Sequence, residues 1–529
     1  MKKYFDYFKK HSDLIGYIVL ALFFVYMMFQ IYPRLYYSME SDMSSELVLA
    51  KLLASEKAII SKIWYYSTEI RVLNTNLIFM PLFLITDNWL TVRMVGMGIL
   101  IIILFLSYYY LARQLNMKHI PWIGFMIVGT ISKDYYKVVT LDSCYIPHIV
   151  ISFLSMGLLI SIHSELNRNK KIIKSVVLML LSLGAGLEGA RLVFLTYMPV
   201  VVAAIMYYFF NQLDNLKEGK FEFKKDYIEL IVIAILTFVA GFIGALINGK
   251  VLRNLGYSFQ SGGLEVFYAP FTFEQLATVI NGWLYALGYQ ADHLFAFIPI
   301  QIIIKPLFAL FFVIFNFALI HMIMKYKEYE KYEKFILMYF IVAALIISLL
   351  FTFTDTWYRD RYLLPVSVYS AFIVGIFLSR FKIDWQKYIM LLLVVMFLAI
   401  NTRFQIRYRA DNNPYAIMPE IRDILIKNNC YNGYSQDHWS GNNILTELSN
   451  GEIETWVFRN GNIDDIAVWL QSKEHRTRHA TGKVYLFLIK EDYEEVKFKQ
   501  DVSRFIKYND GYRTLYIFDS YEQLKSLTS

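Results

Sequence analysis

Two acidic side chains stand four residues apart in the stretch YYSMESDMSSELVLAKLLASEK (residues 36–57), which directly follows the first long apolar run. On a helix, positions i and i+4 share one face, so Asp42 and Glu46 point the same way. Carboxylates held together can accept a proton from an incoming hydroxyl group or hold a divalent metal ion. Repulsion between two such groups raises the pKa of one of them, which suits a general base. An ordinary solvated helix face is the alternative.

Two further charged side chains follow on the way to the second apolar run. Glu69 lies in WYYSTEIR (64–71), and Arg93 lies inside the start of the apolar run that NWLTVR opens. A lone cation in an apolar span is costly unless it is paired or faces a polar cavity. Snorkelling of the Arg93 side chain toward the interface is the simpler interpretation. Glu69 is a reserve candidate for the acidic site.

Arginines also gather at the ends of later apolar runs. LEGARL places Glu188 and Arg191 in a tight turn, where they either pair with each other or face a cavity. FTDTWYRDRYLLP (353–365) holds Arg359 and Arg361 beside two aspartates. Arginine suits phosphate oxygens better than lysine does, because two N–H groups can bind at once. A structural cluster of salt bridges remains the alternative.

Two other polar stretches are weaker candidates for a functional site. KDYYKVVTLDSCYIPH (133–148) is charged, and DHWSGNN (437–443) contains Asp437 and His438, but such residues are more often packed or solvated polar groups. The sequence contains no Gly-rich phosphate loop, no His/Cys metal spacing and no nucleophile elbow. Two cysteines are too few for a disulfide framework or a zinc site. Cytoplasmic nucleotide chemistry is therefore not expected.

The composition indicates a membrane protein. Of the 529 residues 57% are hydrophobic and only 18% are charged, whereas soluble proteins carry about 25% charged residues. Apolar runs long enough to cross a bilayer recur along the first 400 or so positions. The net charge of +8 lies mostly in short loops, so it does not indicate nucleic-acid binding. The sequence predicts a polytopic α-helical protein of about eleven spans. The predicted spans are 14–33, 91–112, 120–138, 143–162, 172–188, 191–211, 228–248, 303–324, 335–354, 362–379 and 388–403.

The apolar segment 73–86 decides the predicted topology. It is too short to span and contains Pro81, and if it does not cross, every strongly basic loop lies on the cytoplasmic side. We therefore expect a cytoplasmic amino terminus and an extracytoplasmic carboxyl terminus. The juxtamembrane segment 34–90 and the loop 249–302 then face outward. Residues 271–289 in that loop have the apolar spacing of an amphipathic helix.

We expect two domains. Residues 1–403 form the transmembrane domain, and residues 404–529 form a small extracytoplasmic α/β domain with helix-like and strand-like patterns and a YNDGY turn. Charged residues not explained by topology lie mostly on the predicted outer face. That face is therefore the expected functional face.

The order of the motifs resembles the GT-C superfamily of polyprenyl-phosphate-sugar-dependent glycosyltransferases, which includes protein mannosyltransferases and aminoarabinose transferases. The motifs are ESDMSSE after the first span, NWLTVRMVG at the second and RYLLP at the mouth of a late span. The resemblance covers residues 1–403 and implies a bacterial plasma-membrane enzyme that inverts configuration. The adjacent Asp–Glu pair and the Pro-rich stretch common in the family are missing here.

The resemblance also implies roles for individual residues. Asp42 matches the family's catalytic acid, with Glu40 or Glu46 beside it, and these acids would hold a Mg²⁺ or Mn²⁺ ion if the enzyme uses one. Arg93 and Arg361 match the family arginines that bind the carrier phosphate. From their own positions, Arg191 and Arg359 join them as candidate donor-binding residues, and Glu69 joins the candidate catalytic acids.

The predicted function is transfer of a monosaccharide from a polyprenyl-phosphate carrier to a surface glycan, lipid or protein in the cell envelope. A flippase or permease for lipid-linked glycans is the rival class, and a transporter would place its ionisable residues near the middle of the membrane. Here they gather at one face, which favours an enzyme. A non-catalytic assembly protein of the envelope is the third alternative. The sequence leaves the sugar and the acceptor open.

Overall fold

The computed structural model describes residues 2–217, 224–259, 267–289, 299–355, 358–436, 442–490, 492 and 495–528. The chain forms two compact units. Unit 1 comprises Met1–Phe29, Leu100–Asn248 and Leu264–Gln405. Unit 2 comprises Gln30–Ile99, Gly249–Gly263 and Ile406–Ser529, so it combines the juxtamembrane segment, part of a later loop and the tail.

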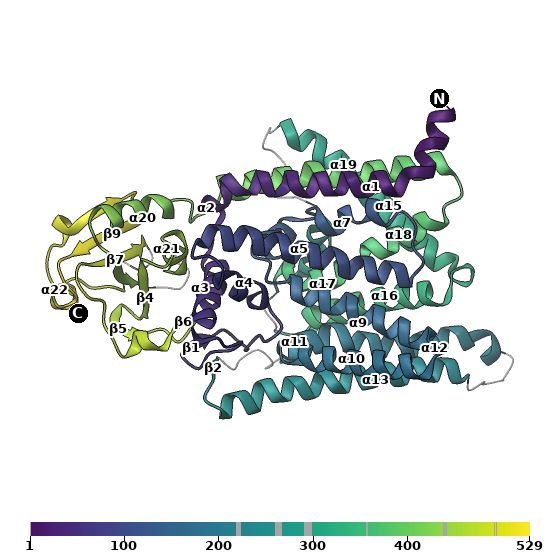
Figure 1. The fold of residues 1–529 in the computed structure, drawn as a ribbon, viewed down its shortest axis with the longest axis horizontal. Helices are drawn as coiled ribbons and strands as arrows, with labels where there is room; N and C mark the ends of the chain where they lie inside the picture. Colours follow the sequence, from purple (N-terminus) through teal and green to yellow (C-terminus); the bar gives the residue numbers. More distant parts are fainter. Residues whose placement is uncertain are drawn as a thin grey trace. The chain divides into compact units, whose positions relative to one another are not determined.

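The polytopic helical architecture is confirmed (Figure 1). Among the described residues, nine helices are long and apolar enough to cross a membrane, and each coincides with a predicted span. Many of their large apolar side chains are exposed in the isolated chain, as expected for helices that face lipid. The nine helices are Lys9–Ser38, Trp89–Gln114, Ile146–Ser164, Ala190–Leu213, Lys225–Leu252, Ile302–Met324, Lys331–Phe353, Asp360–Arg380 and Asp384–Asp411.

The other two predicted spans differ from a regular apolar helix. The segment 172–188 belongs to α10 (Arg168–Gly186), whose first two turns are strongly basic. The segment 120–138 is broken into α6 (Ile120–Ile123), α7 (Phe125–Val128), the single turn α8 (Lys133–Tyr135) and the start of a π-helix (Tyr136–Leu141). The Asn401 side-chain amide donates to the carbonyls of Thr130 and Ile131 at 2.9 and 2.8 Å. These bonds satisfy backbone groups that a bilayer could not.

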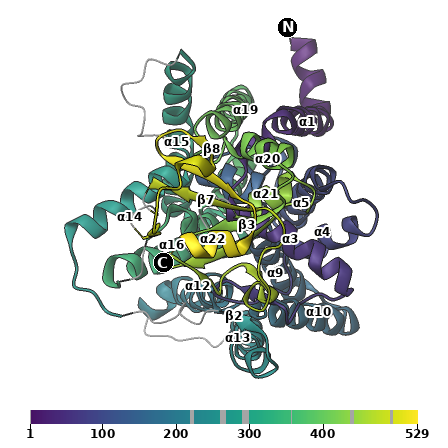
Figure 2. The same ribbon diagram turned by 90° about the vertical axis from the view of Figure 1, so that its left-hand side faces the viewer.

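Close helix packing in unit 1 depends on small residues. α10 and α13 (Lys225–Leu246) approach so closely that a Cβ atom on Gly186 would lie 1.9 Å from the Gly241 carbonyl oxygen. Glycine allows this approach, as it does in other membrane helix pairs. α1 (Lys2–Ile31) and α19 (Asp384–Asp411) lie side by side in both views (Figures 1 and 2), and Lys9 Nζ lies 2.5 Å from Asp384 Oδ2.

The predicted C-terminal α/β fold is confirmed in unit 2. Its six-stranded mixed sheet has the order β5-β4-β3-β7-β9-β8, and Figure 2 views it with α22 (Tyr521–Leu527) toward the reader. The apolar core includes Tyr434, Trp456, Leu486 and Phe518. The YNDGY stretch forms the β8–β9 turn, where Gly511 has a φ of +83°. The strands are β3 (Asn432–Ser435), β4 (Glu454–Arg459), β5 (Asn462–Ile466), β7 (Val484–Ile489), β8 (Ile506–Asn509) and β9 (Arg513–Phe518).

A second, smaller sheet joins three distant parts of unit 2. Its order is β2-β1-β6, formed by Ser258–Phe259, Trp64–Tyr66 and Gln471–Ser472. These strands come from the juxtamembrane segment, the loop after residue 248 and the tail. The sequence did not predict this sheet, because strands of two or three residues leave no periodic pattern.

Two predicted juxtamembrane elements are present. The segment 73–86 contains only the eight-residue helix α4 (Asn76–Phe83), which is too short to cross a bilayer. The segment 271–289 contains α14 (Phe273–Ala286), which begins with a capping box between Thr272 and Gln275. If α4 does not cross the membrane, the strongly basic loops all lie on one side, as the predicted topology requires.

We predict that the carboxyl-terminal tail lies outside the cell and that the connection between α18 (Ser370–Arg380) and α19 lies inside. In a background with Cys144→Ser and Cys430→Ala, a cysteine at the exposed position Lys507 should react with an impermeant thiol reagent in whole cells. A cysteine at the exposed position Lys382 should react only after lysis. The reverse pattern would invert the topology.

Candidate functional site

The predicted acidic pair lies at the start of helix α3 (Ser41–Glu56) in unit 2, and Asp42 is in its first turn. The Asp42 side chain is half-buried. The positive end of the helix dipole stabilises a negative charge at this position. Asp42 is also close enough to Glu46 to act on it electrostatically, as the i, i+4 spacing predicted.

Glu46 is held more tightly than Asp42. Its carboxylate accepts a hydrogen bond from Thr75 Oγ1, and Arg71 Nη1 lies 3.7 Å away. Burial raises the pKa of Glu46, Asp42 raises it further, and Arg71 and Thr75 oppose the rise. Glu46 therefore retains a proton more readily than an exposed glutamate does.

Glu69 belongs to the same group through Arg71. The Glu69 carboxylate accepts a hydrogen bond from Thr68 Oγ1 at 3.1 Å and lies 3.8 Å from Arg71 Nη2. Arg71 thus lies between two glutamates and lowers the local negative charge. Glu69 stays a reserve candidate.

Arg93 is buried and paired within unit 2. Its side chain is 0% exposed, and its guanidinium binds both carboxylate oxygens of Glu447 at 3.0 and 2.9 Å. Arg93 Nη2 also donates to the Met43 carbonyl at 2.8 Å, and the guanidinium lies 5.3 Å from the centre of the Phe79 ring. These contacts engage Nε and Nη2, whereas Nη1 has no hydrogen-bond partner among the described residues. Arg93 therefore has a structural role in unit 2, and its donor-binding role stays a prediction.

A second ion pair holds the acid that precedes α3. Arg409 Nη2 lies 3.0 Å from Glu40 Oε2, and Arg409 Nε donates to the Ser38 carbonyl at 3.2 Å. Asn413 Nδ2 donates to the carbonyls of Tyr37 and Met39 at 2.8 and 2.7 Å. Glu40 thus holds the entry to α3 in place. It is not a candidate base.

In unit 1 the structure brings two predicted arginines together. The guanidinium of Arg191, in α11 (Ala190–Leu192), lies 5.1 Å from the centre of the Tyr362 ring. The guanidinium of Arg361 lies 5.9 Å from the same ring. Glu188, in the same turn, is buried, and its pairing with Arg191 stays a prediction. The two motifs that supply these arginines are 170 or so residues apart, and both place cations at one ring.

Tyr145 lies within the field of the same two arginines. It is buried, and burial raises the pKa of its phenol to about 12, while Arg191 and Arg361 both act in the opposite direction. Its ring lies 5.6 Å from the ring of His148, one of the polar residues in the 133–148 stretch. The arginine cluster therefore consists of Arg191, Arg361, Tyr362 and Tyr145.

Arg359 lies beside a neighbouring cleft of about 410 Å³ in unit 1. The cleft is lined by hydroxyl, amide and carboxyl groups, including those of Asp134, Asn281 and Asp360. Asp355, from the same motif, has a structural part, because its carboxylate accepts a hydrogen bond from the Phe267 backbone at 2.9 Å.

The acids do not form a closed metal-ligand set. Among the described residues, no group of three or more His, Cys, Asp or Glu side chains is arranged to hold a metal ion. The Glu46 carboxylate is already bound to Thr75 and lies near Arg71. We therefore derive no step through Mg²⁺ or Mn²⁺. Asp437 and His438 lie outside the described residues.

Comparisons with known proteins define the fold. No protein-family model and no curated protein sequence matches this chain. The structure of ArnT from Cupriavidus metallidurans bound to undecaprenyl phosphate matches 95% of this chain and 98% of its own, with a TM-score of 0.52 and 10% identity. The apo oligosaccharyltransferase of Archaeoglobus fulgidus matches 85% of this chain at 11% identity and a TM-score of 0.46. This chain spans only 65% of that protein's length.

The chain has the GT-C fold. The resemblance inferred from the sequence motifs is therefore confirmed at the level of the fold, and it extends beyond residue 403 into the tail. The fold does not itself assign the residues, and the contacts described above separate two groups within it. Asp42, Glu46 and Glu69 form the acidic group in unit 2, and Arg191, Arg361 and Arg359 form the cationic group in unit 1.

The sequence did not reveal three of the residues that hold these groups. Glu447 pairs with Arg93, Arg409 pairs with Glu40, and Tyr362 joins two arginines. Only Tyr362 carried a signal, because it stands inside the RDRYLLP motif. The two ion pairs connect residues 354 and 369 positions apart, and no local pattern reveals such partners.

Glu447→Leu should destabilise unit 2, because it leaves the Arg93 charge buried without a partner at a cost of about 3–5 kcal/mol. The measurement is the thermal unfolding of the purified protein, followed by trypsin cleavage within unit 2. The double variant Arg93→Met, Glu447→Leu should recover most of the loss, since an apolar pair replaces the ion pair. Glu522→Gln, at an exposed carboxylate, serves as the control. Unchanged unfolding of Glu447→Leu would contradict the structural role.

Proposed function

We propose that this protein is an integral-membrane glycosyltransferase that moves a monosaccharide from a polyprenyl-phosphate carrier to an acceptor at the outer face of the membrane. The observation that carries the proposal is the convergence of Arg191 and Arg361 on Tyr362. The full-length likeness to an aminoarabinose transferase that holds undecaprenyl phosphate supports it through the shared fold. The proposal does not extend to the sugar or the acceptor that the Cupriavidus enzyme uses.

Arg191 and Arg361 are the proposed ligands of the carrier phosphate. Each guanidinium can donate two parallel hydrogen bonds to phosphate oxygens, which lysine cannot do. Attraction between a phosphate and two guanidinium groups strengthens where water is scarce, as at the end of a membrane span. Arg359, beside the adjacent cleft, is assigned to the sugar side of the donor.

Asp42 is the proposed general base. The acceptor hydroxyl oxygen attacks the anomeric carbon, and Asp42 takes the hydroxyl proton. The bond between the anomeric carbon and the phosphate oxygen breaks, and polyprenyl phosphate leaves with that oxygen. Attack from the face opposite the phosphate inverts the configuration. Glu46, with its raised pKa, tunes the charge beside Asp42, and Glu69 is the reserve base.

Deletion of the gene distinguishes transfer from transport. Mass spectrometry of lipid-linked sugars and surface polymers should find the lipid-linked monosaccharide accumulated and the surface polymer unmodified. A lipid-linked sugar that is restricted to the cytoplasmic leaflet would instead identify a flippase. Unchanged sugars and polymers would leave only the assembly role.

Asp42→Asn should reduce transfer from purified lipid-linked donor by about 10²–10⁴-fold, the usual contribution of a general base. The exchange is nearly isosteric, so the thermal unfolding of the protein should not change. Glu56→Gln, at an exposed carboxylate at the other end of α3, is the matched control and should transfer normally. Full activity of Asp42→Asn would remove it from the mechanism.

Arg361→Lys should raise the KM for the lipid-linked donor more than it lowers kcat. Lysine keeps the positive charge and loses the two-pronged hydrogen bonding that binds phosphate. Arg168→Lys, at the exposed basic end of α10, should leave both constants unchanged. If Arg361→Ala uses the donor as the unchanged protein does, the phosphate assignment is wrong.

A further inference from the structure

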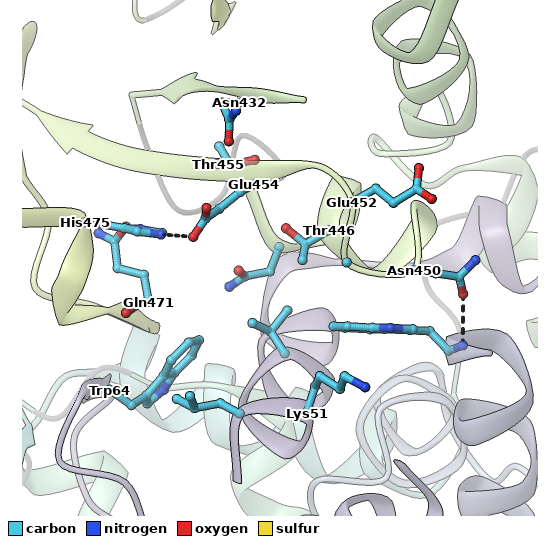
Figure 3. A pocket seen from close by; sticks show the side chains of 16 residues that line it. Lys51, Trp64, Asn432, Thr446, Asn450, Glu452, Glu454, Thr455, Gln471 and His475 are labelled. Carbon is cyan, nitrogen blue, oxygen red and sulfur yellow. Dashed lines mark hydrogen bonds and ion pairs between the residues drawn. The ribbon is translucent and has the colours of Figure 1, made fainter. Parts of the chain in front are cut away.

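Unit 2 contains a pocket of about 410 Å³ that the proposed catalytic groups do not use (Figure 3). One wall comes from the middle of α3, from β1 and from the start of α5 (Trp89–Gln114). The other comes from α21 (Asn442–Leu448) and the six-stranded sheet. The volume lies within the range of about 300–1,000 Å³ typical of small-ligand sites.

The walls of the pocket are held in place by specific contacts. The Trp89 backbone N–H donates to Asn450 Oδ1 at 3.0 Å, as Figure 3 shows. The next residue, Gly451, has a φ of +87°, and a Cβ atom there would lie 3.1 Å from the Trp89 ring. Asn443 Nδ2 donates to Ser45 Oγ at 2.9 Å, which ties α21 to α3. Because these contacts already fix the pocket walls, little free energy is spent on ordering the walls when a ligand binds.

The charged side chains of the lining are balanced within the protein. Lys51 Nζ lies 2.5 Å from Asp87 Oδ1. The Glu454 carboxylate interacts with His475 Nε2 at 2.8 Å and with Arg478, and these partners hold the pKa of Glu454 below its usual range despite burial. In Figure 3 the Glu452 carboxylate points away from the other lining side chains.

The other side chains that line the pocket are uncharged. Asn432, Asn443 and Thr446 present amides and a hydroxyl, and the indoles of Trp64 and Trp89 supply apolar wall. The described lining contains no arginine, so the pocket does not suit a phosphate or a nucleotide. Its amide and hydroxyl groups would be left without hydrogen bonds beside a lipid chain, which does not favour a lipid ligand. A peptide strand would need a free sheet edge or a long groove rather than a closed-in pocket.

We propose that this pocket binds a neutral sugar unit. Sugar hydroxyl groups both donate and accept hydrogen bonds. The Asn432 amide uses one N–H for the Thr481 carbonyl and has a second N–H beside its oxygen, so it can bind two neighbouring hydroxyl groups. The apolar C–H faces of the ring match the indole wall. In terms of the proposed function, on which this step rests, the pocket holds a non-reacting sugar of the acceptor, so the acceptor is a glycan.

The test uses the full-length protein in lipid nanodiscs, free of glycoside detergents that would compete for the pocket. The probe is a printed array of capsule and cell-wall oligosaccharides, and the sugar bound most strongly is titrated by tryptophan fluorescence. Thr446→Phe, which fills the pocket without removing a side-chain hydrogen bond that the structure records, should weaken binding about tenfold or more. Thr446→Ser keeps the hydroxyl and the space, and should bind as the unchanged protein does.

Asn432→Leu is the second variant, and it should also weaken binding. It keeps the test valid if Thr446→Phe does not fold. No saccharide retained on the array, or equal binding by the unchanged protein and both pocket variants, would overturn the proposal. Asp42→Asn separates the two hypotheses, because it should bind the sugar normally. Sugar binding without any transfer would overturn the proposed function alone, and transfer without sugar binding would overturn the pocket alone.

Discussion

A guanidinium that is shielded from water must have its charge neutralised, and unit 2 is organised around that requirement at Arg93. Glu447 meets it with both carboxylate oxygens, and the Met43 carbonyl accepts a further hydrogen bond. The pair therefore joins the start of α5, the first turns of α3 and helix α21. The helix that carries Asp42 and the wall of the sugar pocket both depend on this contact.

Hydropathy and local spacing predicted the parts of the structure that local physics decides. Nine apolar helices, the helix beginning at Ser41 and the YNDGY turn all depend on residues within a few positions of one another. The break in 120–138 was missed because residues 120–131 are mostly apolar, and the side chain that satisfies their backbone, Asn401, lies far along the chain. Composition does not record such a partner.

The candidate site shows the same difference between local features, which the sequence predicts, and long-range contacts, which it does not. Residue type indicated correctly that Arg93 needs a partner or a cavity, but nothing marked Glu447 among the many acids of the tail. The spacing of Asp42 and Glu46 predicted their shared helix face, whereas the Thr75 and Arg71 contacts of Glu46 needed three dimensions.

The arginine cluster of unit 1 depends on ordinary core packing. The Tyr362 ring stacks on Phe351 with centres 5.8 Å apart and planes 4° from parallel. Phe351 belongs to an apolar cluster with Val279 and Leu363, so the ring that meets both guanidinium groups has a fixed position. Preorganised side chains bind a ligand with less loss of entropy than mobile ones.

The small β2-β1-β6 sheet has a consequence for biogenesis. Its three strands are synthesised in the order β1, β2, β6, and about 400 residues separate β1 from β6. The juxtamembrane segment therefore leaves the ribosome long before its last strand partner and its ion-pair partner exist. Unit 2 can complete its fold only after β6 has been synthesised. Until then the segment after the first membrane helix lacks these contacts and is open to proteases.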